Sequence, residues 1–166
     1  MTLLTAEIRA LVGRTKAYTA PEPMGAAAGR YFGLAIGDDN PLYSDPEYAR
    51  AQGLDDVTAP PTLICETNQY AGLPIDPDGH AGHTWGIDLP GTRQVRGGNR
   101  YVFHRRILPS DIVTATWEIT EVAGKRNRAG ADMLLITSRA TYTQQDGDLL
   151  AENEETIIYV SLEAGA

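Results

Sequence analysis

The C-terminal half of the chain follows the two-residue period of β-strands. Between residues 112 and 120 apolar and polar positions alternate, and one face of this segment carries Val113, Ala115, Trp117 and Ile119. An Asp146-Gly147 pair further along is typical of a hairpin turn. Together with the neighbouring apolar runs, these signals predict antiparallel strands over residues 101–104, 112–120, 133–143 and 156–160.

The N-terminal half carries helix caps and terminating glycines instead. Thr5 is a predicted N-cap, and Ser44 or Asp45 followed by Pro46 is a second helix start. Glycines at positions 25, 29 and 33 weaken an otherwise Ala-rich apolar helix, and such small residues indicate close packing. Helices are predicted over residues 6–12, 24–36, 46–52 and 63–71, the last ended by Gly72.

Helices first and long strands afterwards predict an α+β fold. A sheet with one apolar face must be covered, and the predicted helix 63–71 is the natural cover. The chain has 166 residues without a repeat or a linker, so one domain spanning residues 1–166 is expected. Residues 73–92 are dense in Pro, Gly, Asp and His and predict a long irregular loop, a kind of segment that is often functional.

Composition excludes several classes of protein. The formal net charge of −8 repels phosphate backbones and argues against nucleic acid as a partner. No run approaches the roughly 20 apolar residues of a membrane span, and the first residues lack the pattern of a signal peptide. We therefore expect a cytoplasmic protein without a membrane partner. Its single cysteine, Cys65, allows no internal disulfide and is expected as a small core residue rather than a nucleophile.

Positive charge is concentrated in one part of this acidic chain. Residues 93–128 hold eight of the 14 lysines and arginines but only three acidic residues. Such a patch suits an anionic ligand or an acidic carrier protein. A solvated strand face with a charged hairpin tip is the other interpretation.

The segment around Asp38 is the most informative in the chain. An apolar helix is predicted to end at Gly37, after which Asp38 and Asn40 lie in a tight connection that Pro41 fixes. This geometry directs polar side chains to a defined place. The simpler interpretation is that both residues only cap and turn the chain.

The segment over residues 31–49 resembles the signature of the MaoC-like, hydratase-type hotdog family. In that signature an apolar helix end is followed by Gly-Asp-x-Asn-Pro, an aliphatic residue and His. Further matches, in the order of the family's N-terminal dehydratase branch, lie at residues 8–13, 57–62, 96–101, 109–111 and 146–147. The resemblance covers nearly the whole chain. It implies a hotdog fold, in which an antiparallel sheet wraps a long central helix, and dimers that join two sheets edge to edge.

The resemblance also implies an activity, the hydration of trans-2-enoyl thioesters or the reverse dehydration. The substrate is carried on coenzyme A or on an acyl carrier protein, and no other cofactor and no metal are expected. Asp38 matches the family's base and Asn40 its asparagine, but Tyr43 stands at the position of the catalytic histidine. A tyrosine titrates near 10 and is a poor proton shuttle at neutral pH.

A second departure lies at the start of the predicted helix 63–71. Catalytic members have His-Gly there, and a backbone N–H at this helix start helps to hold the thioester oxygen. Pro60 and Pro61 have no N–H, so the donor has to come from Thr62 or from elsewhere. Both departures are typical of the half that binds the acyl group and pairs with a catalytic hotdog partner. The alternatives are a non-catalytic, thioester-binding homodimer and a self-sufficient homodimer that uses Asp38 with Tyr43 or a loop histidine.

Further candidates come from the long loop and from the basic stretch. His83, beside Trp85, is a candidate acid or base; His80 and His83 form an H-x-x-H pair but lack a third fixed metal ligand. A plain surface loop is the simpler interpretation. In this family the pair Gly97-Gly98 lies near the dimer seam and the pantetheine route. We therefore predict that substrate binding involves this pair and the nearby arginines, together with the candidate donor at the start of helix 63–71: Thr62, Arg96, Gly97, Gly98 and Arg100.

Overall fold

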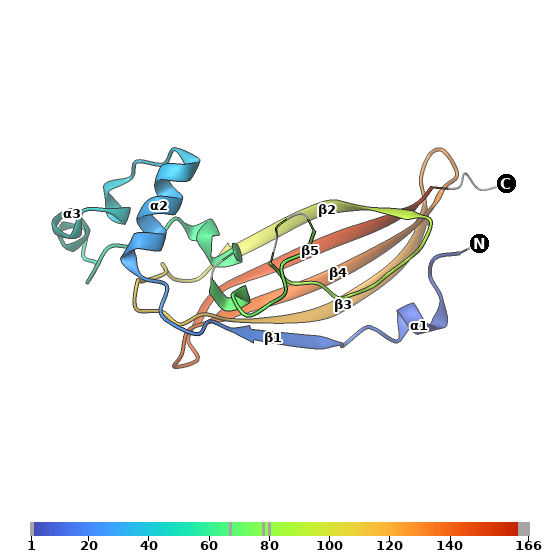
Figure 1. Cartoon of the computed structure of the whole chain (residues 1–166), viewed down its shortest axis with the longest axis horizontal. Coiled ribbons are helices and arrows are strands. Elements are labelled where there is room, and N and C mark those ends of the chain that lie inside the picture. Colours follow the sequence, from blue (N-terminus) through green and yellow to red (C-terminus); the bar gives the residue numbers. More distant parts are fainter. Residues whose placement is uncertain (1, 67, 78, 80, 163–166) are drawn as a thin grey trace.

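A five-stranded antiparallel sheet forms the body of the molecule (Figure 1). The structure is a computed structural model and describes residues 2–66, 68–77, 79 and 81–162. The strand order is β1-β3-β4-β5-β2, so that β1 and β2 are the two edges. The strands are β1 Thr15–Thr19, β2 Thr92–Phe103, β3 Thr114–Arg126, β4 Asp132–Thr143 and β5 Leu149–Ser161.

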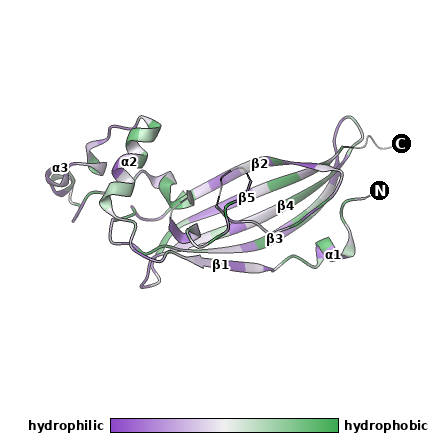
Figure 2. Ribbon diagram, viewed as in Figure 1, coloured by the Kyte–Doolittle hydropathy of each residue, from purple (hydrophilic) through white to green (hydrophobic). Residues whose placement is uncertain are grey.

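The face of β3 predicted to be apolar is buried. Ala115, Trp117 and Ile119 are each at most 5% exposed, and they pack with Leu134 and Ile136 of β4 in the main core. This confirms the alternation, because a strand with one buried face places every second side chain in the core. Figure 2 shows the hydrophobic positions along the central strands.

Two short 3₁₀ segments and a loop cover this core. The segments are η2 Pro61–Glu66 and η3 Asn68–Tyr70, where a single helix over 63–71 is predicted. Side-chain bonds bear on the difference: the Gln69 amide donates to the nearby carbonyl of Ile64 at 2.9 Å, and the Asn68 amide donates to the carbonyl of Glu22, far away in sequence, at 3.0 Å. Side chains that bond to the backbone in this way compete with the α-helical pattern. The prediction of a long central helix is therefore wrong for this chain, which has two short 3₁₀ segments in that place.

The residues after η3 lie on the sheet as an irregular segment, as predicted. The Trp85 indole N–H donates to Ser138 Oγ of β4 at 2.9 Å, and Lys16 Nζ of β1 donates to the carbonyl of Thr84 at 2.6 Å. The loop thus takes over part of the covering role of the expected helix.

The remaining helices lie near the two ends of the sheet, with α2 and α3 beyond one end and α1 alongside the other (Figure 1). At one end are α2 Ala26–Ile36, η1 Pro41–Tyr43 and α3 Pro46–Ala51, and at the other is α1 Ala6–Arg9. Both predicted caps are present: Thr5 Oγ1 accepts from the N–H of Ile8, and the Asp45 carboxylate accepts from two N–H groups of α3. Among the described residues, no helix has the length and apolarity that crossing a membrane requires.

The edge strands differ most from the sequence prediction. β1 is not predicted at all, and β2 begins at Thr92 rather than near residue 101. β2 pairs with β5 over its whole length, with a register shift between Arg96 and Gly98 that marks a bulge at the glycine pair. This pairing supplies the hydrogen bonds that make residues 92–100 a strand despite their polar, glycine-containing sequence. β3 and β5 are also longer than predicted.

Candidate functional site

The Gly37–Tyr43 connection holds Asp38 in a fixed position. Gly37 ends α2 with a positive φ of 73°, and the N–H of Asp38 donates to the carbonyl of Gly33 at 2.9 Å. Asp38 Oδ1 accepts from the N–H of Asn40 at 3.2 Å, and Oδ2 accepts from the Tyr43 hydroxyl at 3.3 Å. Asn40 Oδ1 accepts from the N–H of Leu42 at 3.1 Å and so caps η1. Three predicted catalytic residues therefore lie together.

Tyr43 acts here as a hydrogen-bond donor. Its side chain is buried, and the residue is 6% exposed. Burial, then the charge of Asp38 and the hydrogen bond to it, raise the pKa of Tyr43 above its ordinary value of 10.0. At neutral pH the phenol keeps its proton and gives it only as a hydrogen bond to Asp38.

Two glycines of α2 allow this connection to pack closely on the chain before η2. A Cβ on Gly29 would lie 3.1 Å from the Cβ of Ala59, and one on Gly33 would lie 3.1 Å from the carbonyl oxygen of Asp38 and 3.3 Å from the Tyr43 ring. The four-residue spacing places both glycines on one face of the helix. The absence of side chains there lets Asp38, Tyr43 and Pro60 lie close to the same face of α2, since a Cβ on Gly33 would also lie 3.8 Å from the Pro60 ring.

A groove of about 330 Å³ lies where the end of β2 meets the start of η2. Ala59 and Pro61 form one part of its wall, and the residues 103–107 form the other. Backbone hydrogen bonds link this wall to the Gly37–Tyr43 connection: the N–H of Ala59 donates to the carbonyl of Ile107 at 3.3 Å, and the N–H of Thr58 donates to the carbonyl of Leu42 at 2.8 Å. The turn that carries Arg106 is fixed by Asp111, whose carboxylate accepts both guanidinium bonds of Arg105 at 2.8 and 2.9 Å.

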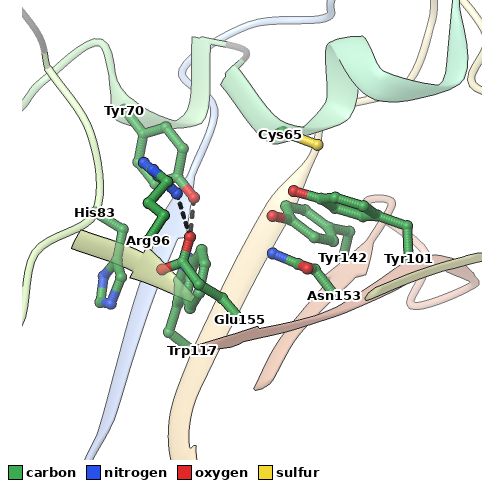
Figure 3. A pocket seen from close by; sticks show the side chains of 9 residues that line it. All are labelled: Cys65, Tyr70, His83, Arg96, Tyr101, Trp117, Tyr142, Asn153 and Glu155. Atoms are coloured by element: carbon green, nitrogen blue, oxygen red, sulfur yellow. Dashed lines mark hydrogen bonds and ion pairs between the residues drawn. The ribbon is translucent and has the colours of Figure 1, made fainter. Parts of the chain in front are cut away.

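A second hollow lies on the core face of the sheet (Figure 3). Its volume is about 50 Å³, measured as the space open to the centre of a water molecule. The lining comes from η2, η3, the loop and four strands: Cys65, Tyr70, His83, Arg96, Tyr101, Trp117, Tyr142, Asn153 and Glu155. Arg96 forms an ion pair with Glu155 at one side. We call this hollow the polar cavity.

His83 is held inside an aromatic cluster at the polar cavity. Its ring stacks on Trp117 with centroids 4.2 Å apart and meets Trp85 edge-on at 4.6 Å. Nδ1 lies 3.1 Å from the Tyr18 hydroxyl. Burial, and then the charges of Lys16 and Arg14, lower the pKa of His83 from 6.5 to about 3. The imidazole is therefore neutral at physiological pH.

The predicted site residues fall into two groups. Asp38, Asn40 and Tyr43 lie beside the groove, whereas His83 and Arg96 line the polar cavity. Between the two, Thr62 is an exposed residue of η2. Gly97, Gly98 and Arg100 lie on β2 at the sheet edge. His80, the other histidine of the H-x-x-H pair, lies outside the described residues.

The lining residues that sequence reasoning missed are mainly Asn153, Glu155 and the tyrosines. Asn153 and Glu155 are two positions apart on β5 and so share one face, which is the face toward the core. Polar residues at core-facing strand positions are unusual, so both could be identified as site candidates from the sequence. This identification requires knowing where β5 begins, which the sequence prediction placed too late.

Comparison with known proteins places the chain in a family. Residues 10–153 match the family described as "FAS1-like, dehydratase domain region". The chain is 36% identical over 132 residues to a UPF0336 protein of Thermobifida fusca, covering 77% of this chain and 80% of that protein. It is 27% identical over 155 residues to a probable enoyl-CoA hydratase alpha subunit of Thermomonospora curvata, covering 87% of this chain and 48% of that protein.

Solved structures agree with the hotdog prediction. A chain of the ChsH1–ChsH2 complex from Mycobacterium tuberculosis has a TM-score of 0.72 at 24% identity, with 97% of this chain and 90% of that chain covered. A chain of the HadBC complex, a 3R-hydroxyacyl-ACP dehydratase of the same organism, has a TM-score of 0.59 at 25% identity, with 87% and 96% covered. In sequence and in fold, the protein belongs to the FAS1-like dehydratase-region family, within the MaoC-like hotdog hydratases and dehydratases.

Proposed function

We propose that this chain is the acyl-binding subunit of a hydratase or dehydratase that acts on acyl thioesters, and that a second hotdog subunit supplies the catalytic Asp and His. The carrier of the acyl group is coenzyme A or an acyl carrier protein. The related enoyl-CoA hydratase sequence is an alpha subunit, and the related dehydratase structure is a two-subunit complex, which supports a partner of this kind.

The observation that carries the proposal is the pairing of Asp38 with Tyr43. Hydration needs a group that exchanges a proton with the substrate near neutral pH, next to the base. Beside Asp38 the position of such a group is occupied by the Tyr43 phenol, whose pKa is raised and whose hydroxyl already donates to the Asp38 carboxylate. His83, the candidate replacement, stacks on Trp117 in the polar cavity and has a pKa of about 3. Neither side chain is a proton shuttle for Asp38 at physiological pH.

The shape of the chain supports a binding role. η2 runs from the groove, which Pro61 lines, to the polar cavity, which Cys65 lines. β2 follows the same course, with Phe103 at the groove and Tyr101 at the cavity, and their rings stack 5.8 Å apart. We infer that the thioester lies in the groove and the acyl chain follows η2 and β2 inward.

The test is turnover and binding by the purified full chain, alone and with a partner. Hydration of a short and a medium trans-2-enoyl-CoA is followed by the loss of absorbance of the conjugated thioester, and binding of the saturated acyl-CoA by calorimetry. We expect binding without turnover from the chain alone. Turnover should begin when a hotdog subunit with the complete Gly-Asp-x-Asn-Pro-x-His signature is co-purified with it.

Asp38→Asn serves as the control for the chain alone. Turnover by the lone chain that disappears in Asp38→Asn would contradict the proposal, because it would show a complete site in this subunit. Absence of any acyl-CoA binding, by the chain alone and in the complex, would contradict it as well.

A further inference from the structure

The polar cavity contains two buried polar atoms without a hydrogen-bond partner among the described residues. They are Oδ1 of Asn153 and Nε2 of His83. Asn153 is 1% exposed and lies in the middle of β5, next to β2 and β4. A buried amide oxygen or imidazole nitrogen is costly to leave unpaired, and most such groups in proteins have a partner. Both atoms therefore point to a ligand group that completes them.

The cavity differs from a pocket for a hydrocarbon chain. Hydrocarbon tails favour walls without unpaired polar atoms, because such atoms lose their hydrogen bonds to water when the tail enters. Here Asn153 and Glu155 project from β5 on the same side, and Arg96 reaches Glu155 from β2 (Figure 3). The side-chain exposures of the ion pair are 63% for Arg96 and 13% for Glu155, so the arginine lies on the solvent side and the carboxylate on the cavity side.

The charges at the cavity favour a neutral group. Glu155 and Arg96 compensate each other, so a further carboxylate on a ligand would lie next to Glu155 without a free cation from this pair. Asn153 Oδ1 is only an acceptor and needs a donor. A hydroxyl group is a neutral donor that also accepts, so it can complete either atom.

We propose that the polar cavity binds a hydroxyl group near the far end of the acyl chain. The subunit then selects acyl thioesters hydroxylated at that end over unsubstituted ones of the same length. This proposal rests on the acyl-binding function proposed above. The hydroxyl donates to Asn153 Oδ1, and a second oxygen function on a longer chain reaches His83 Nε2. The cavity volume of about 50 Å³ has room for roughly three or four water-sized groups, which is the size of a short oxygenated chain end.

The course of the chain toward the cavity makes the selection depend on length. The groove and the cavity are both lined by η2 and β2, so a chain must extend past Phe103 and Tyr101 before its end meets Asn153. A hydroxyl near the thioester stays in the groove. Only a hydroxyl near the far end of a chain of suitable length reaches the cavity.

The experiment compares matched pairs of acyl-CoA thioesters with the full chain. Each pair has the same length, short, medium or long, and differs only in a hydroxyl at or next to the last carbon. Dissociation constants are measured by calorimetry. For at least one length we expect the hydroxylated member to bind about fivefold to tenfold more tightly, the effect of one neutral hydrogen bond.

Two substitutions and one control locate the effect. Asn153→Leu keeps the approximate shape of the side chain but removes the acceptor, and His83→Phe keeps a ring against Trp117 but removes Nε2. We expect Asn153→Leu to bring the affinity ratio of the matched pair to about one. Thr156→Val, an isosteric change three positions further along β5, alters a hydroxyl that lies 3.2 Å from that of Thr137 and should leave the ratio unchanged.

The outcomes separate this inference from the function on which it rests. Equal affinities within every pair, or a preference that survives Asn153→Leu in the folded protein, would overturn the inference and leave the acyl-binding function standing. Absence of binding of any thioester would overturn both. If Asn153→Leu does not fold, the His83→Phe variant is the test, and the hydroxylated member of the matched pair then carries two oxygen functions on the longer chain. We expect the affinity ratio of that pair to fall in His83→Phe, and an unchanged ratio would count against the inference.

Discussion

Tyr43 shows how a single residue changes what Asp38 can do. A histidine at this position would exchange protons near neutral pH, whereas the tyrosine holds its proton and fixes the carboxylate by a 3.3 Å hydrogen bond. Asn40 caps η1 at the same time and fixes the turn. The connection thus holds Asp38 in place but pairs it with a phenol, not with a group that titrates near neutral pH.

His83 predicts a pH dependence of stability. Its pKa is about 3 in the folded protein, below the ordinary 6.5, so between these values the unfolded chain binds a proton that the folded one does not. The free energy of unfolding therefore contains a contribution that is complete above pH 6.5 and is lost as the pH falls toward 3. We expect urea denaturation at a series of pH values to show this loss.

His83→Phe is the matched control for this prediction. The variant keeps an aromatic ring on Trp117 but carries no titrating group, so its stability should fall less steeply between pH 6.5 and about 3. Nitrogen chemical shifts of the wild-type imidazole give a direct second measurement. A titration of His83 near 6.5 in the folded protein would contradict the predicted burial of a neutral ring.

The parts of the candidate site whose conformation depends on neighbouring residues could be predicted from the sequence. The Asp38–Tyr43 connection depends on a terminating glycine, an Asx-type cap and a proline within a few positions, and these set the local backbone almost alone. Asn153 and Glu155 were not readable as a site, because their role depends on η2, β2 and the loop meeting the same face of β5. Such meetings are properties of the tertiary fold.

At the scale of elements, the close packing of α2 depends on its two contact glycines, Gly29 and Gly33. Gly29→Ala places a methyl group 3.1 Å from the Ala59 side chain and 3.2 Å from the carbonyl oxygen of Thr58, neither of which can move freely. Overpacking costs about 1–3 kcal/mol, against a helix-propensity gain of about 1 kcal/mol. We expect a net loss of up to about 2 kcal/mol in the free energy of unfolding, measured by urea denaturation.

Gly72→Ala is the control for that change. A Cβ at Gly72 meets nothing within 4 Å and its φ is not positive, so the substitution should alter stability by less than about 0.5 kcal/mol. Equal effects of the two substitutions would show that the Gly29 contact does not limit the packing of α2.

Elements with a strong local pattern were predicted best. The alternating face of β3 and the capped starts of α1 and α3 follow from residues close in sequence. The segment 61–70 has the apolar content of a helix, but Gln69 and Asn68 bond to backbone carbonyls instead. β1 and the first part of β2 exist because β3 and β5 offer them hydrogen bonds, which no local pattern reports.

At the scale of the whole molecule, the edge strand β2 bears on the choice of partner. It carries Arg93, Arg96 and Arg100 and no acidic residue, and Arg96 is compensated by Glu155 of its own sheet. If two copies of β2 pair antiparallel about this stretch, Arg93 of one copy approaches Arg100 of the other. Like charges opposite each other destabilise a strand pair by about 0.2–1 kcal/mol each. A partner with an acidic edge strand is favoured.

This argument predicts how self-association responds to salt. The lone chain should associate weakly at low ionic strength and more strongly as salt screens the arginines, and Arg93→Glu should strengthen association at low salt. Sedimentation of the purified chain over a range of sodium chloride concentrations measures both. A self-association that weakens with salt, or that Arg93→Glu reduces, would contradict the charge argument. Arg50→Glu, an exposed change on α3 away from β2, controls for net charge.

The same strand has a consequence for handling the protein. β2 is 12 residues long and stands at the end of the sheet order, and a free edge of this length is a template for uncontrolled chain-to-chain pairing. The bulge at the glycine pair and the mutual repulsion that comes from a net charge of −8 keep unpartnered molecules in solution. Near the isoelectric point of about 4.8 that repulsion vanishes, so preparations made without a partner subunit are most prone to precipitate there.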